Sequence, residues 1–187
     1  MKLIVTSCKA VLAFTLITGG AYPFVLWLSG QFLFSYQANG SLVYKNEKVI
    51  GSELLAQKTI SNQQLHPRPS SSDYATVPSG GTNAYFTDSQ LIKRIKQPSP
   101  LGEDVTQSAS GLDPHLNLEN ALGQLERISQ TRHWTPLQRK RAEEWIATHT
   151  QGGIICPAYI NVFMFNLALE NLDKPQWVRN RNARILT

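Results

Sequence analysis

The stretch AVLAFTLITGGAYPFVLWLSG, residues Ala10 to Gly30, decides how the rest of this chain can be organised. The hydrocarbon core of a bilayer is crossed by about 20 apolar residues in a helix, and this stretch has that length. No Asp, Glu, Lys or Arg occurs from Ala10 to Tyr44. The sequence therefore predicts a single transmembrane helix over residues 10–30.

Three residues in this stretch are unusual for a soluble helix but common in membrane helices. Gly19, Gly20 and Pro23 would loosen or kink a helix in water and are tolerated in a bilayer. Gly19 and Gly20 also allow a neighbouring membrane helix to approach closely. Trp27 is suited to the headgroup region.

A cleaved signal peptide is the alternative interpretation of the same stretch. The apolar run is longer than the roughly 7–15 residues of a signal sequence, and no A-x-A cleavage site follows it. These two observations favour a retained anchor.

The flanking charges predict the orientation of the anchor. Lys2 and Lys9 precede it, and the next basic residue after it is Lys45. Because basic residues stay on the cytoplasmic side, residues 1–9 are expected in the cytoplasm and residues 31–187 outside it. This places a single-pass protein in the cell (inner) membrane.

Composition limits what the exported part can bind. The chain of 187 residues has a net charge of +5, and its basic residues cluster in IKRIK and RKRAEE. Each run is typical of a solvated helix face, so nucleic acid is not an expected partner. Its 2 cysteines, Cys8 and Cys156, fall on opposite sides of the predicted membrane, so no internal disulfide is expected.

The exported part is predicted to be an α+β domain, with a small β-sheet packed on two or three helices. Residues 41–52 alternate as in a β-hairpin, and ELLAQKTI (53–60) could begin a short helix. Apolar spacing and capping signals predict helices over residues 88–96, over 117–132 after an Asn117 cap, and from a Thr135–Gln138 capping box to about Thr148. An apolar strand is expected at residues 160–165 and a fraying polar tail at 174–187.

Residues 61–100 are rich in Ser, Pro, Gly and Asn, which is typical of a linker. They also carry His66, Arg68, Tyr74 and Tyr85 at irregular intervals. These residues make the segment unlike a plain Gly/Ser spacer, and a long ordered loop in a compact domain is usually functional or held by packing.

Metal binding and thiol catalysis are both weakly indicated. His66, His115, His133 and His149 include no pair at helical zinc spacing, so no metal site is expected. Cys156, His149 and Asp113 are the residue types of a thiol triad, which leaves a membrane-anchored hydrolase as an alternative function. Cys156 at the start of an apolar strand is better explained as a small buried thiol.

An anion-binding module is the other alternative. The Ser79, Gly80, Gly81 and Asn83 segment offers amides that could hold a phosphate, with Arg68 nearby. The segment lacks the G-x-x-x-x-G-K-[ST] pattern, and a tight turn with positive φ explains its glycines more simply.

The loop SGLDPHLN, residues 110–117, places an aspartate and a histidine either side of a proline. Gly111 permits an unusual backbone angle, and Asp113 before Pro114 suits an Asx turn. Asn117 can then cap the next helix. The loop is predicted to be helix-entry architecture, with a structural or subunit-contact role for His115.

One amino-terminal span is followed, in this order, by VIGSELLAQ, HPRPSSSDY, SGGTN, SGLDPHLNLENALGQLERI, THT and INVFMFNLALE. This ordered set resembles the C subunit (KdpC family) of the Kdp potassium-transporting P-type ATPase complex. The resemblance extends from the anchor to about Leu172. Residues 84–90, Gln107 and the tail past Leu172 depart from the family pattern.

The resemblance implies an accessory subunit without its own catalytic site or tightly bound cofactor. Its partners would be a channel-like potassium-binding subunit and a P-type subunit that hydrolyses ATP. The family has been described as a catalytic chaperone that raises the ATP affinity of the hydrolysing subunit. An exported domain cannot touch a cytoplasmic nucleotide, so we expect it to cap the outer face of the channel-like subunit and ATP to act only through the complex.

Overall fold

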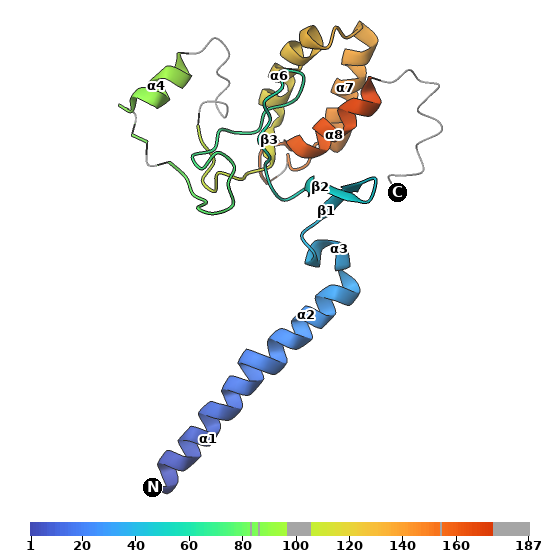
Figure 1. Cartoon of the computed structure of the whole chain (residues 1–187). Helices are drawn as coiled ribbons and strands as arrows, with labels where there is room; N and C mark the ends of the chain where they lie inside the picture. Colours follow the sequence, from blue (N-terminus) through green and yellow to red (C-terminus); the bar gives the residue numbers. More distant parts are fainter. Residues whose placement is uncertain (83, 86, 97–105, 154, 174–187) are drawn as a thin grey trace. The chain divides into compact units, whose positions relative to one another are not determined.

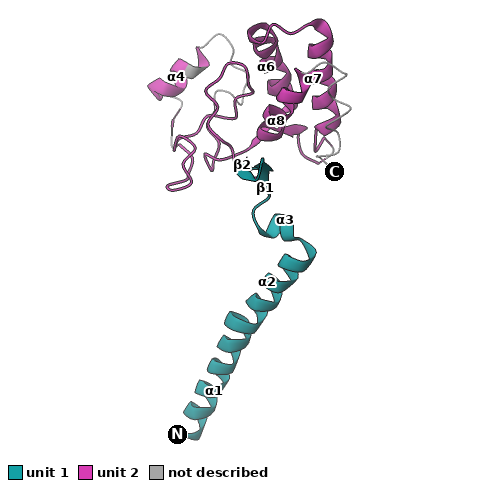
Figure 2. Cartoon of the chain, turned by 45° about the vertical axis from the view of Figure 1, so that its right-hand side comes forward, with its two compact units in different colours: residues 1–52 teal, residues 53–187 magenta. Residues whose placement is uncertain are grey.

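The computed structural model describes residues 1–82, 84–85, 87–96, 106–153 and 155–173. The chain divides into two compact units, residues 1–52 and 53–187 (Figure 2). Each unit is described by itself. The predicted tail at residues 174–187 lies outside the described residues.

The first unit begins with one continuous apolar helix, Lys2–Leu33, of 32 residues (Figure 1). It consists of α1 (Lys2–Leu16), a π-helical turn η1 (Ile17–Ala21) and α2 (Tyr22–Leu33). None of its residues is buried within the chain. Among the described residues it is the one helix long and apolar enough to span a membrane. The predicted apolar anchor is confirmed as a helix, and its membrane limits at residues 10 and 30 stay a prediction.

The predicted hairpin is also confirmed. After a short helix α3 (Ser35–Ala38), strands β1 (Leu42–Lys45) and β2 (Lys48–Ser52) pair antiparallel. Asn46 and Glu47 between them have φ of 51° and 62°. Two consecutive residues with positive φ match the twist of the flanking strands, so the two strands can pair as a hairpin around this turn.

The second unit is built on three helices and a two-stranded sheet. Helix α6 (Leu118–Thr131) packs on α7 (Pro136–His149), and α7 packs on α8 (Val162–Leu172). Strands β3 (His115–Asn117) and β4 (Tyr159–Asn161) pair antiparallel and lead into α6 and α8 (Figure 1). The buried core is formed by Leu65, Leu116, Ala121, Leu125, Ile128, Ala142, Ile146, Ile160, Val162, Phe165, Leu169 and Leu172.

Side-chain caps determine where the helices begin. Asn117 accepts a hydrogen bond from the Asn120 amide at 2.8 Å, and Thr135 forms the predicted capping box with Gln138. Both predicted caps are confirmed. Each satisfies an amide that the first helical turn leaves without a partner.

Two predicted elements are wrong. The apolar run at residues 160–165 is a strand only to Asn161, whose side chain accepts the Met164 amide and starts α8. Phe165 and Leu169 then fall on one buried face, four residues apart. Residues 53–60 form no helix, because the Ala56 amide donates to the Leu112 carbonyl rather than to its own turn.

The predicted helix at residues 88–96 is present as α4 (Ser89–Ile95). Asp88 caps it, with Oδ1 accepting the Gln90 amide at 2.7 Å and the Leu91 amide at 3.2 Å. The segment 84–90, which departs from the family pattern, therefore contains the residue that caps α4.

Polar side chains of α6 and α8 hold residues 62–67, a turn followed by an extended segment, against the helices. The Asn166 amide on α8 accepts from the Leu65 N–H at 2.8 Å and donates to the Leu65 carbonyl at 2.9 Å. Gln124 on α6 does the same for His66, at 2.9 and 3.1 Å. Arg127 donates to the Gln64 carbonyl at 3.0 Å. The segment is therefore paired as a strand would be, but by side chains.

We predict that Asn166→Leu lowers the free energy of unfolding by about 2–4 kcal/mol, because it leaves both backbone groups of Leu65 without a partner. Urea denaturation of the detergent-solubilised full chain, followed by tryptophan fluorescence, measures the change. Asn62→Leu, the same substitution at an exposed position of the same segment, is the matched control and should cost much less. Equal losses in the two variants would contradict the role given to Asn166.

Candidate functional site

Two loops that are far apart in the sequence meet in the second unit. We call residues 66–82 and 106–117 together the signature loops. The Ser108 amide donates to the Pro69 carbonyl at 3.2 Å, and the Gly80 amide donates to the Ser110 carbonyl at 3.1 Å. Ser108 is only 2% exposed. The two loops hold each other through these backbone bonds.

Gly111 is the tightest point between the two loops. Its φ is +71°, as the sequence predicts, and a Cβ there would lie 2.8 Å from Ser70 Oγ and 2.9 Å from Ser72 Oγ. Glycine is therefore required twice, for its backbone angle and for the space.

The Ser79–Gly81 segment, considered above as an alternative anion site, packs against the second loop. Gly80 and Gly81 are not among the glycines with positive φ, so the predicted turn geometry is wrong. The Gly80 amide donates to the Ser110 carbonyl, and a Cβ built on Gly81 would lie 3.1 Å from the Ala109 carbonyl oxygen. Packing against the second loop, rather than a left-handed turn, explains Gly81, whereas a Cβ on Gly80 would meet nothing within 4 Å. Asn83 lies outside the described residues.

Arg68 points toward the second loop. Its Nη2 lies 3.4 Å from Thr106 Oγ1 and 3.3 Å from the Gln107 carbonyl. Its Nη1 lies 3.5 Å from Asp113 Oδ2. The structure thus brings together Arg68, predicted for an anion site, and Asp113, predicted for the helix entry. Long contacts and partial burial make this a loose ion pair.

Asp113 and His115 form the predicted Asx turn. Asp113 Oδ1 accepts the His115 amide at 3.0 Å and lies 3.4 Å from His115 Nδ1. The His115 ring meets the Tyr159 ring edge-on at 4.7 Å between centroids. The carbonyl of Pro114, between the two, accepts the Val162 amide at 2.9 Å. The loop therefore continues directly into the β3–β4 pairing.

These contacts change the acidity of Asp113. Hydrogen bonding from His115 lowers the pKa of its carboxyl group below the usual value near 4, and the charge of Arg68 acts in the same direction. Partial burial opposes both effects. The ionised form of Asp113 is the one this site stabilises.

Two of the three thiol-triad residues, Asp113 and His149, have other partners. Asp113 is bonded to His115, and the His149 ring stacks on Trp145 at 3.9 Å with its Nδ1 2.9 Å from the Trp145 carbonyl. Cys156 is exposed and free, so the predicted buried thiol is wrong. It lies in a loop before β4 rather than inside a strand. Among the described residues no group of three His, Cys, Asp or Glu could hold a metal ion.

Two residues at the site were not expected from the sequence. Tyr159 precedes the strand predicted at residues 160–165, and no motif includes Thr106. Their contacts with His115 and Arg68 depend on tertiary pairing, so no local spacing signals them. Tyr74, noted only as an irregular aromatic, donates its hydroxyl to the Arg68 carbonyl at 3.0 Å.

We predict that Gly111→Ala destabilises the fold more than Gly153→Ala. Both glycines have positive φ, +71° and +93°, but a Cβ at Gly153 has nothing within 4 Å. The Gly153→Ala variant should therefore be destabilised only by the cost of a non-glycine residue at positive φ, about 1 kcal/mol. The Gly111→Ala variant should be destabilised by that cost and also by crowding against Ser70 and Ser72. Urea denaturation of the full chain compares the two, and equal losses would show that space at residue 111 is irrelevant.

We predict that Asp113→Asn lowers stability at pH 7 but not in acid. A carboxyl with a lowered folded-state pKa contributes stability above its unfolded-state pKa of about 3.9 and loses it as pH falls through the folded-state value. The difference between wild type and variant should be constant from pH 7 to about 5 and shrink below about pH 4. Thermal or urea unfolding across this range measures it. A difference that persists in acid would contradict the ionised role.

Comparison with known proteins covers nearly the whole chain. The family model described as KdpC, K+-transporting ATPase, c chain, matches residues 4–171. The potassium-transporting ATPase KdpC subunits of Staphylococcus aureus strains bovine RF122 / ET3-1 and MSSA476 are each 34% identical over 180 residues, covering 88% of this chain and 95% of theirs. The KdpC subunit 1 of strain Mu50 / ATCC 700699 matches equally well, with 34% identity over 180 residues. The chain belongs to the KdpC family, the c chain of K+-transporting ATPases.

Proposed function

We propose that this chain is the accessory, non-catalytic subunit of an ATP-driven potassium importer. Its partners would be a channel-like subunit that binds potassium and a P-type subunit that hydrolyses ATP. The observation that carries the proposal is the family match over residues 4–171, together with relatives named as subunits of a potassium-transporting ATPase. The apolar helix Lys2–Leu33 supports assembly in the membrane.

The polar contacts of the signature loops support the non-catalytic part of the proposal. Arg68 lies against Thr106, Gln107 and Asp113, and the Asp113 carboxylate is held by His115. Catalysis needs a group aimed at a substrate, whereas these groups are used to fasten one loop to the other. His115 remains assigned to structure or subunit contact.

The flanking charges support an extracytoplasmic position for the folded unit. Lys2 and Lys9 precede the apolar helix, while no basic residue follows it until Lys45. With residues 1–9 in the cytoplasm, the second unit would cap the outer face of the channel-like subunit. It would then be separated by the membrane from ATP.

This orientation limits how a chaperone role could operate. Arg68 and residues 79–81 could not contact a cytoplasmic nucleotide directly. Any increase in ATP affinity would pass through the anchor or through the channel-like subunit, by stabilising one conformation of the complex. The chain itself would hold no tightly bound cofactor.

We predict that a carboxyl-terminal alkaline phosphatase fusion is active and a matched green fluorescent protein fusion is dark, because the carboxyl terminus is exported.

The same membranes, solubilised in mild detergent, should yield the chain together with both larger subunits. Deleting the chain should abolish potassium-stimulated ATP hydrolysis.

A fluorescent fusion with an inactive phosphatase would reverse the orientation and reopen direct ATP contact. A chain that purifies alone, with hydrolysis unaffected by its deletion, would overturn the subunit assignment itself.

A further inference from the structure

The π-helical turn in the apolar helix leaves a backbone carbonyl without an amide partner. The Tyr22 amide donates to the Ile17 carbonyl, five residues back. The next residue, Pro23, has no N–H to donate. The Phe24 amide can reach back only to Gly19 or Gly20, so the carbonyls of Thr18 and Gly19 share at most one helical amide.

Local side chains do not compensate for this loss. The Thr18 hydroxyl is the nearest donor in sequence, and it donates to the Phe14 carbonyl at 2.7 Å. The flanking residues Ile17, Gly19, Gly20 and Ala21 carry no polar side chain. At least one carbonyl of the turn therefore needs a donor from outside the helix.

The depth of the turn excludes the usual donors. Gly19 and Gly20 lie at the middle of the predicted span over residues 10–30, about 15 Å from either end at 1.5 Å per residue. Lipid tails donate no hydrogen bonds, and headgroups and bulk water lie at the ends. An unsatisfied carbonyl at this depth costs several kcal/mol.

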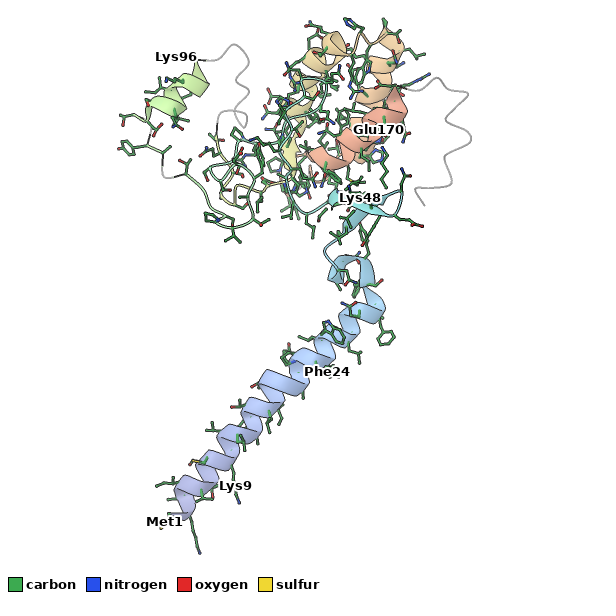
Figure 3. All side chains as sticks on the ribbon, in the orientation of Figure 1. Met1, Lys9, Phe24, Lys48, Lys96 and Glu170 are labelled. Carbon is green, nitrogen blue, oxygen red and sulfur yellow. The ribbon has the colours of Figure 1, made fainter. Side chains whose placement is uncertain are left out.

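The surface around the turn is open. A Cβ built on Gly19 or Gly20 would meet nothing within 4 Å, and no residue of η1 is buried. Bulkier side chains such as Phe24 extend from the neighbouring turns (Figure 3). The glycines therefore leave the freed carbonyl accessible to a closely packed helix.

We propose that a transmembrane helix of a larger subunit crosses this chain at Gly19–Gly20 and donates a side-chain O–H or N–H to the freed carbonyl of Thr18 or Gly19. The partner is recognised by its chemistry, a serine, threonine, asparagine or glutamine on a small-residue helix face. This inference rests on the proposed function, since the partner helix belongs to the same complex.

Site-specific photo-crosslinking in the intact complex locates the partner helix. Leu16 lies one helical turn before Gly19–Gly20 on the same side, and Phe14, two residues earlier, lies on nearly the opposite side. A benzophenone side chain at residue 16 should label a larger subunit, and peptide mapping should place the label near a hydroxyl or amide side chain. Stronger labelling from residue 14, or labelling of lipid alone from residue 16, would overturn the proposal.

Retention of the chain in purified complex then tests the hydrogen bond. Gly20→Leu should release the chain, whereas Ala10→Leu, the control elsewhere in the anchor, should not. Removing the mapped donor on the partner should lower the association constant about 3- to 16-fold in the wild type. The same removal should have little effect in the Pro23→Ala chain, whose restored amide can satisfy the carbonyl internally.

The outcomes separate the two proposals. If the wild-type chain copurifies with both subunits but Gly20→Leu behaves like Ala10→Leu, or donor removal costs the same in both backgrounds, the inference fails and the subunit assignment stands. If the wild-type chain does not copurify at all, the proposed function fails first.

Discussion

The fold of the second unit depends on satisfying the backbone of one extended segment. Leu65 is fully buried, so its own amide and carbonyl enter the interior with it and must be paired there. Asn166 on α8 pairs with both of these groups. Gln124 on α6 does the same for the backbone of the next residue, His66. The two helices are thereby joined through a third piece of chain, in addition to their apolar contacts. Burial of the Leu65 side chain and pairing of its backbone are both needed here, because a buried amide or carbonyl without a partner is unfavourable.

The signature loops follow the same principle with backbone groups in place of side-chain amides. Residues 66–82 and 106–117 have little regular secondary structure, yet they are tied by amide–carbonyl bonds at Ser108 and Gly80. Close packing at Gly111 and Gly81 leaves no room for side chains between them. A region whose composition is typical of a linker is therefore packed through its own backbone groups.

Local patterns were sufficient for part of this structure. The apolar helix, the hairpin turn and the caps at Asn117 and Thr135 each depend on neighbours within a few residues, and each was predicted correctly. The strand predicted at residues 160–165 failed because the Asn161 cap competes with an apolar run that suits either structure. Pairing of β3 with β4, and the meeting of Arg68 with Asp113, join residues far apart in sequence. Periodicity contains no information about such contacts.

The attachment of residues 64–66 by individual side chains also fixes where the chain can tolerate a change in length. A strand in a regular ladder can slip by two residues and find equivalent bonds, but Asn166 and Gln124 each match one residue only. A residue inserted at position 65 would move the backbone groups of this segment away from the side-chain amides of Asn166 and Gln124. Upstream, the exposed Lys58–Asp73 ion pair joins solvated side chains, which can adjust to a change in length more easily. Variation in length among related chains should therefore avoid residues 64–66.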